Sequence, residues 1–265
     1  MIGLSLGLSL SRHTGGGGDQ AFTPASLFAS GEAGVWGDPS PTTCFTDTSG
    51  ATPAGAGDAV ARINDSSGNG NNIIQSTVAA RPLLKQTVGG DWYLDYSGTD
   101  DGMATAAIDF SASDKISVFA SIEAEGSNTS VIVETAADYT SVNGSFVLYR
   151  QTSQGLGLNS KGSSDQTLSV STGYAAPTKQ VLSGLIDISG NSSILRANGS
   201  VILSSTGDLG TGNFGNHVLN VGARNNAGSL FFNGKLFSFV VRGAATSGDQ
   251  LIDAETWMDE RGSIT

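Results

Sequence analysis

Short apolar runs, separated by turn-forming residues at intervals of about eight to twelve positions, fill the chain from Met103 onward. The clearest run covers residues 116–122, and the breaks between runs consist of Gly, Asn, Ser and Asp. Runs of this length and spacing are typical of the strands of an antiparallel β-sandwich or barrel. The other runs that we predict to be strands are residues 130–133, 145–149, 166–170, 180–188, 193–195, 201–203, 218–221, 230–232 and 235–241.

Two Asn-Gly pairs predict tight hairpins within this region. Asn198-Gly199 lies between two predicted strands and is the strongest such signal, because a two-residue hairpin turn needs positive φ angles that Asn and Gly tolerate. Asn233-Gly234 predicts a second hairpin. Strands joined by short turns, with almost no helix between them, exclude a doubly wound α/β fold.

Before Met103 the pattern is less regular. Residues 92–96 alternate bulky side chains on two faces and predict a strand, and residues 60–63 predict a shorter one. Between them, residues 65–72 hold only Asp, Ser, Gly and Asn, which is typical of a tight turn. Residues 19–58 contain four prolines and few periodic apolar positions, so we expect an irregular connecting segment.

One helix is predicted, at residues 247–261. Thr246 or Ser247 can cap its start, and Gly262 can end it. The carboxylate of Asp249 lies in the first turn, where the helix dipole favours a negative charge. The helix is expected to pack on the edge of the sandwich through one apolar face, with an oligomer or docking contact as the alternative. The apolar residues assigned to that face are Leu251, Ile252, Ala254, Trp257 and Met258.

The first ten residues alternate strictly between apolar and small side chains, a pattern that makes a strand with one apolar face. This run is too short for a transmembrane helix and lacks the features of a signal peptide, so we expect no membrane insertion. It is either a strand of the same domain or an arm that docks on a partner by strand addition, and the Gly15–Gly18 tether that follows favours the arm. The predicted docking residues are Ile2, Leu4, Leu6, Leu8 and Leu10. The chain then divides into an arm and tether at 1–18, a connection at 19–58 and a sandwich with its helix at 59–265.

An ordered set of short motifs carries a resemblance to known families. The run Asp-Ser-Ser-Gly-Asn-Gly-Asn at 65–71 is similar to the opening of concanavalin A-like (laminin-G-like) lectin and glucanase domains. Gly-Val-Trp-Gly-Asp-Pro-Ser at 34–40, Phe-Thr-Asp at 45–47, Ala-Ala-Arg-Pro at 79–82 and Tyr-Leu-Asp-Tyr at 93–96 together resemble a segment common in structural proteins of tailed bacteriophages. The resemblance extends over residues 31–262 and implies an all-β fold, an antiparallel jelly-roll sandwich of the concanavalin A-like type.

Composition narrows the classes of partner. Thirteen Lys and Arg against 24 Asp and Glu give a net charge of −11, which repels phosphate backbones, so we expect no nucleic-acid partner. The single cysteine, Cys44, excludes an internal disulfide and is expected to be an inert buried or loop thiol. Only His13 and His217 are available for a catalytic triad or a histidine metal site, and neither lies in a suitable motif.

The resemblance includes glucanases, which carry catalytic carboxylates in a Glu-x-Asp-x-(x)-Glu motif on a strand. Glu123 and Glu125 stand two residues apart, with Asp187 as the other candidate, but the third carboxylate of the motif is missing. The sequence therefore predicts a protein that is not an enzyme. A glycan depolymerase acting through Glu123 and Glu125 is the less favoured alternative.

Calcium is the one metal that the sequence could supply, although no cofactor is required. Carboxylate and amide oxygens suit Ca²⁺, and laminin-G-like domains often hold one at the rim of the sandwich. The same residues are common in turns for backbone reasons alone. The candidates are Asp65, Asn69, Asn71, Asp100 and Asp101. For a bound glycan, Tyr139, Tyr149 and Tyr174 are the candidate aromatic platforms.

The resemblance and the arm together predict a structural protein of the phage virion, such as a tail, fibre or capsid-decoration component. In this hypothesis the arm binds other virion proteins, the chain forms a homo-oligomer with a trimer favoured, and the sandwich is displayed for attachment to the host surface. The alternative is a lectin module with a defined sugar site for a host-surface glycan. The two differ in whether that site exists.

Overall fold

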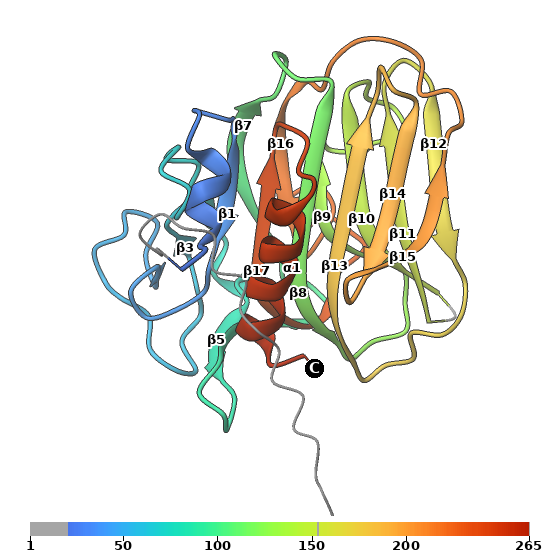
Figure 1. Cartoon of the computed structure of the whole chain (residues 1–265). Coiled ribbons are helices and arrows are strands. Elements are labelled where there is room, and N and C mark those ends of the chain that lie inside the picture. Colours follow the sequence, from blue (N-terminus) through green and yellow to red (C-terminus); the bar gives the residue numbers. More distant parts are fainter. Residues whose placement is uncertain (1–20, 153, 265) are drawn as a thin grey trace, which may run out of the picture.

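The computed structural model describes residues 21–152 and 154–264, which fold into a β-sandwich of two antiparallel sheets with one C-terminal helix (Figure 1). Every strand pair is antiparallel. The predicted fold class is confirmed. The arm residues Ile2, Leu4, Leu6, Leu8 and Leu10 lie outside the described residues.

The first sheet, sheet A, has eight strands. Its strand β17 (Asn233–Arg242) pairs with β8 (Lys115–Ala124) along one edge and with β6 (Trp92–Ser97) and β1 (Gly34–Gly37) along the other. Residues 233–236 of β17 pair with β6, and residues 239–242 pair with β1, so two strands share one edge of β17. Its members, in spatial order, are β15 (Ser200–Ser205), β14 (Ser192–Ala197), β13 (Thr178–Asp187), β8 (Lys115–Ala124), β17 (Asn233–Arg242), β6 (Trp92–Ser97) and β5 (Leu83–Gln86), with β1 (Gly34–Gly37) beside β17.

The second sheet, sheet B, has nine strands and packs against the inner face of sheet A. Its members, in spatial order, are β12 (Asp165–Val170), β11 (Gly155–Lys161), β10 (Ser145–Gln151), β9 (Ser130–Thr135), β16 (Asn216–Val221), β7 (Met103–Asp109), β4 (Ile73–Ile74), β3 (Arg62–Ile63) and β2 (Cys44–Phe45). The main core lies between the two sheets and draws on the inward positions of nearly every strand, such as Leu94, Val118, Leu148 and Leu158. Burying these apolar side chains is the dominant stabilising contribution to the sandwich.

A second, smaller core covers the outer face of sheet A. Helix α1 (Asp249–Gly262) lies across β8, β13 and β17, and the short 3₁₀ helix η1 (Pro24–Phe28) packs beside it (Figure 1). A second 3₁₀ turn, η2 (Val78–Ala80), precedes β5. The second core is formed by Leu27, Phe28, Phe119, Val181, Val240, Ala254 and Met258.

The predicted helix exists but starts later and packs differently from expectation. Its N-cap is Gly248, with no side-chain cap, because Thr246 is buried and its hydroxyl bonds Arg242 instead. Ile252 was expected to widen the apolar face but is exposed, and Glu255 is buried in its place. The reason is a tertiary partner, since Arg196 on β14 forms an ion pair with Glu255 at 2.7 Å.

The two predicted Asn-Gly hairpins have different outcomes. Asn198 and Gly199 have φ angles of 47° and 74° and join β14 to β15, so that hairpin is confirmed. Asn233 and Gly234 instead begin β17, and residues 230–232 form no strand, so both of those predictions are wrong. A Cβ at Gly234 would lie 2.2 Å from the carbonyl oxygen of Glu123, so this glycine permits close approach of two strands rather than a turn.

Several strands were not predicted, including β7 and β11. Residues 19–58 were expected to be irregular, but their described part supplies β1 to sheet A and β2 to sheet B. Trp36 on β1 packs edge-on against Trp257 of α1, with ring centroids 5.3 Å apart. In the part of the chain that the structure describes, no helix combines the length and the apolar character needed to cross a bilayer.

Candidate functional site

The outer face of sheet B carries a polar row instead of a covering helix. Directly paired residues lie on the same face of a sheet, and the register places Ala104, Asn220, Glu134, Val147 and Asn159 side by side across five strands. All five are buried. The loops after β9 and β16 lie over part of this row and leave a groove beside it.

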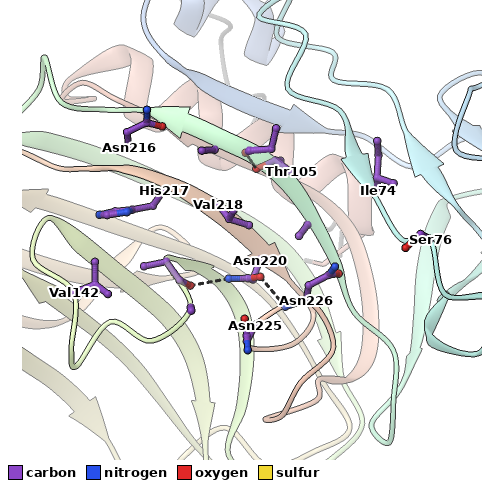
Figure 2. Close-up of a pocket in the computed structure, with 15 residues that line it drawn as sticks. Ile74, Ser76, Thr105, Val142, Asn216, His217, Val218, Asn220, Asn225 and Asn226 are labelled. Atoms are coloured by element: carbon purple, nitrogen blue, oxygen red, sulfur yellow. Dashed lines mark hydrogen bonds between the residues drawn. The ribbon is translucent and has the colours of Figure 1, made fainter.

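The groove has a volume of about 620 Å³ and opens along β7 and β16 (Figure 2). One wall comes from the connection after β9, and the other from the turn after β16 and the residues that follow β4. Its lining residues are Ile74, Ser76, Ala104, Thr105, Ala106, Ala107, Ala136, Ala137, Val142, Asn216, His217, Val218, Asn220, Asn225 and Asn226.

The floor of the groove consists of small side chains. Between the pairs Val218–Ala107 and Asn220–Ala104, β7 has one more residue than β16, which is a β-bulge. The bulge leaves both Ala106 and Ala107 exposed, and Thr105 at its centre accepts a hydrogen bond from the amide of Leu219 at 3.1 Å. The small alanine side chains therefore leave the groove open, whereas larger side chains at these positions would fill it.

Asn220 joins the two walls from beneath. Its side-chain Nδ2 donates to the carbonyl oxygen of Ala136 at 2.7 Å, and its Oδ1 accepts from the amide of Asn226 at 2.8 Å (Figure 2). The side chain of Asn226 in turn accepts from Nε2 of Gln75 at 3.1 Å. The first contact satisfies a buried carbonyl group and the second holds the amide of an exposed rim residue, so this asparagine positions both walls of the groove.

The rim holds an unusual backbone. Ala136, Asn225, Asn226 and Ala227 have φ angles of 72°, 52°, 47° and 67°. Asparagine tolerates this left-handed region, whereas alanine adopts it only at a cost of about 1 kcal/mol or more. Clustered strain of this kind is held by the surrounding contacts, and it is typical of functional sites.

Two groove amides retain their full hydrogen-bonding capacity. The side chains of Asn216 and Asn225 are exposed, and neither bonds to another residue within 21–152 and 154–264. His217 is held differently, with its Nε2 3.2 Å from the carbonyl oxygen of Asn143. A carbonyl can only accept, so Nε2 carries the proton and Nδ1 of the neutral ring is an acceptor.

Among residues 21–152 and 154–264, no Asp, Glu, Lys or Arg lines the groove. Behind the groove, Glu134 and Arg224 form an ion pair joined by two hydrogen bonds of 2.9 and 3.0 Å, and Asp138 lies 3.5 Å from the same guanidinium. Burial raises the pKa of Glu134, and the guanidinium of Arg224 offsets part of that rise. These three charges sum to −1. Two further cations lie near the walls: Arg81 donates to the carbonyl oxygens of Thr46, Gln75 and Ser76, and Lys161 donates to the carbonyl oxygen of Thr140.

Asp65, Asn69 and Asn71, three of the calcium candidates, lie together in the turn after β3. The Asp65 carboxylate accepts four hydrogen bonds of 2.8–3.0 Å, from the amides of Trp36, Ser67 and Asn71 and the hydroxyl of Ser67. The side-chain amides of Asn69 and Asn71 both donate to the carbonyl oxygen of Gly34. These contacts pin the turn to β1, which gives the residues a structural role.

Asp100 and Asp101, the other two candidates, lie in the turn between β6 and β7. Asp101 is buried and accepts from the amide of Ser97 at 2.7 Å, while Asp100 accepts from the hydroxyls of Ser97 and Thr99. Burial raises the pKa of Asp101, and the neighbouring carboxylates add to that rise. Among the described residues, no group of three or more His, Cys, Asp and Glu side chains is placed to hold a metal ion.

Glu123 and Glu125, the catalytic candidates, share one lysine. Lys235 Nζ lies 3.1 Å from Glu123 and 3.3 Å from Glu125, at the start of β17 and the end of β8. Asp187 is separate and pairs with Lys115 at 3.1 Å. The two glutamates therefore have a structural partner where the β8 and β17 ladder ends.

The candidate tyrosines do not line the groove. Tyr139 and Tyr149 bond the same side chain, Asn159, on the outer face of sheet B, and the Tyr149 ring lies against Gly157, where a Cβ would be 2.2 Å from it. Tyr174 packs against the main core, and its carbonyl accepts from Arg150. Cys44 is buried, and burial raises the pKa of its thiol to about 11.

The groove residues were not predicted from the sequence. His217 was considered only as a triad member, and Asn216, Asn220, Asn225 and Asn226 were not singled out. A signal was present, because Asn216 and Asn220 share the parity of the outward positions of a strand, and Asn225-Asn226 directly follow that strand. The bulge and the loops that complete the groove leave no such signal.

No protein-family model matches the chain, and a comparison with curated proteins finds no match. The chain is similar in structure to the receptor-binding domain of botulinum neurotoxin mosaic serotype C/D, at 14% identity and a TM-score of 0.54, over 73% of this chain and 48% of that chain. The receptor-binding domain of botulinum neurotoxin D matches at 14% identity and a TM-score of 0.52, over 74% of this chain and 50% of that chain. A CBM40 of the Ruminococcus gnavus IT-sialidase matches at 18% identity and a TM-score of 0.46, over 64% and 96% of the two chains.

The chain spans about half the length of the neurotoxin domains that it matches. At this identity the likeness concerns the fold alone. It agrees with the lectin-like sandwich that the sequence predicts.

Proposed function

We propose that this protein is a non-catalytic carbohydrate-binding module whose binding site is the groove on the outer face of sheet B. The observation that carries the proposal is an open groove of about 620 Å³, lined by unpaired side-chain amides above a floor of small side chains. Sugar-binding sites need several donors and acceptors that match hydroxyl groups, next to apolar surface for the ring. Asn216, Asn225 and His217 supply donors and acceptors for hydroxyl groups. The alanines and Val218 supply the apolar surface for the ring.

A titration with a set of oligosaccharides tests this proposal. The expected result is saturable binding, measured by calorimetry and by shifts of the side-chain amide NMR signals of Asn216 and Asn225. Asn128→Ala is the control, because Asn128 is an exposed loop amide outside the groove. Shifts confined to residues far from the groove, or no binding across the set, would reject the groove as a sugar site.

A catalytic role for Glu123 and Glu125 has a separate test. If the protein were a glycan depolymerase, cleavage of host polysaccharide would fall sharply in Glu123→Gln and Glu125→Gln. We expect no cleavage by either the original protein or the variants, because Lys235 holds both carboxylates.

Display on a phage particle is a second candidate function, favoured by the alternation of residues 2–10 and by the resemblance of residues 31–262 to phage structural proteins. In this proposal the arm binds other virion proteins, the chain is a homo-oligomer with a trimer favoured, and the open face of sheet B is directed toward a host-surface glycan. Deleting residues 1–18 is expected to abolish incorporation into particles while leaving sugar binding intact. Unchanged incorporation would reject the anchoring role of the arm.

We propose that sugar binding needs no metal. The Asp65 carboxylate already accepts four hydrogen bonds, so calcium would have to displace existing contacts. Affinity for a bound sugar is expected to be the same with excess calcium and with a chelator. A calcium-dependent affinity would restore Asp65 or Asp101 as candidate ligands.

A further inference from the structure

We infer that the groove selects an uncharged sugar, whose ring lies on the alanine floor between Asn216, Asn225 and His217. This inference rests on the proposed function and adds the class of ligand and its contacts. It follows from three properties of the groove: its charge, its floor and its free polar atoms.

The charges in and around the groove disfavour binding of an acidic sugar. A carboxylate in a groove must exchange its water for a partner, and the groove lining contains no Lys or Arg. Two guanidinium groups near the walls are already occupied: Arg224 by Glu134 and Asp138, and Arg81 by the carbonyl oxygens of Thr46, Gln75 and Ser76. The whole chain has a net charge of −11, which adds a long-range repulsion. A neutral sugar meets none of these costs.

The floor suits the apolar face of a sugar ring. Ala104, Ala106 and Ala107 come from β7, and Val218 from the adjacent β16. A sugar ring presents C–H groups on one face, and these can pack on methyl groups by removing apolar surface from water. The groove volume falls within the range of about 300–1,000 Å³ for small-molecule sites, so a short oligosaccharide fits better than a long polymer laid lengthwise.

The free polar atoms suit hydroxyl groups. The amides of Asn216 and Asn225 each offer one acceptor and two donors, and a pair of neighbouring hydroxyls can use both. His217 adds one acceptor, because its other nitrogen donates to Asn143. Asn220 is occupied by Ala136 and Asn226, so it positions the rim without contacting the ligand.

The rim is prearranged for this contact. Asn225 stands in the left-handed region, and the contact of Asn226 with Asn220 holds the turn in place. A side chain that is fixed before binding loses less entropy on binding, which raises affinity for a ligand that fits.

Matched pairs of oligosaccharides test the inference, each pair differing only in a carboxylate: a neutral sugar and its sialylated or uronic-acid counterpart. We expect the neutral member to bind at least tenfold more tightly. Ala107→Leu places a larger side chain on the floor at an exposed position and is expected to lower affinity more than tenfold. Asn225→Gly keeps the left-handed backbone and removes only the amide, so we expect a loss of about two- to tenfold.

The outcomes distinguish a failure of this inference from a failure of the proposed function. If the acidic member binds as tightly as the neutral one, or if Ala107→Leu leaves the affinity unchanged, the inference is overturned while the module can still bind sugar. If no member of any pair binds, the proposed function itself is overturned. Asn128→Ala should match the original protein in every titration.

Discussion

The two outer faces of the sandwich have opposite uses. The outer face of sheet A is apolar and lies under helix α1, where Phe119, Val181 and Val240 pack against Ala254 and Met258. The outer face of sheet B carries a row of polar residues and the open groove. One sheet thus adds a second core, and the other carries the groove that we propose as the sugar site.

On each face, an ion pair also fixes a covering segment. Arg196 and Glu255 tie α1 to β14 on sheet A, and Glu134 and Arg224 tie the turn after β16 to β9 on sheet B. The difference is in what surrounds each pair. Arg196 and Glu255 lie beside the apolar contacts of α1 and line a smaller pocket of about 280 Å³, while strained and exposed rim residues lie beside Glu134 and Arg224. The following variants test whether this contrast is correct.

The largest effect is expected at the covered face. Met258→Ala removes a fully buried side chain between α1 and sheet A and should lower the free energy of unfolding by about 2–5 kcal/mol. Ile252→Ala is the matched control on the same helix, because Ile252 is 60% exposed, and its effect should stay within about 0.5 kcal/mol. Denaturant unfolding measures both. Equal effects would show that the helix does not cover the sheet as described.

A smaller effect is expected at the open face. Asn220→Ala leaves the Ala136 carbonyl and the Asn226 amide without their partner, so stability should fall by about 1–3 kcal/mol. Sugar affinity should fall as well, since the rim loses its support, whereas Met258→Ala should leave affinity unchanged. If Asn220→Ala affects stability alone, the link between this residue and the groove is wrong.

Removing one buried hydroxyl on the covered face should raise stability, whereas the two preceding variants lower it. Ser121 is fully buried under α1, and its Oγ has no hydrogen-bond partner in the described part of the protein. Its removal costs no hydrogen bond, and Ser121→Ala is expected to raise stability by up to about 1 kcal/mol. A thermal or denaturant midpoint below that of the original protein would indicate that a partner exists.

The smallest effect is a pH dependence in the turn that joins the two sheets. Burial raises the pKa of Asp101 in the folded state, so the folded protein binds a proton more readily than the unfolded chain. The stabilising contribution is complete below the usual Asp pKa of about 3.9 and is lost as the pH rises through the raised pKa. Relative to Asp101→Asn, the original protein should therefore lose stability over that interval. Unfolding curves at a series of pH values measure this difference, and a constant difference would contradict it.

Much of the fold could be predicted from the sequence because strand and turn signals are local. The run at 116–122 became β8, and Asn198-Gly199 became the β14–β15 turn, since alternation and positive φ depend on neighbouring residues alone. β11 was missed because its Gly, Asn and Ser residues make a weak strand signal, and it exists because β10 and β12 pair with it on both sides. Asn233-Gly234 failed for the same reason, as pairing with β8 and β6 overrides the local turn preference.

The groove could not be predicted in this way. Asn216, His217 and Asn220 come from one strand, but the alanine floor belongs to β7, and part of the walls comes from segments more than sixty residues away in sequence, after β4 and β9. The Glu123 and Glu125 pair stood out in the sequence instead. Lys235 forms ion pairs with both carboxylates, and it reaches them only through the β8–β17 ladder.

The sequence by itself determined the all-β class, most strand positions, the C-terminal helix and the acidic surface, because these depend on composition and short-range periodicity. Tertiary structure decided which face of each sheet is covered, where the bulge in β7 falls and which asparagines remain free. Those features depend on pairing and packing between segments far apart in the chain, and an open groove exists only where no such segment packs.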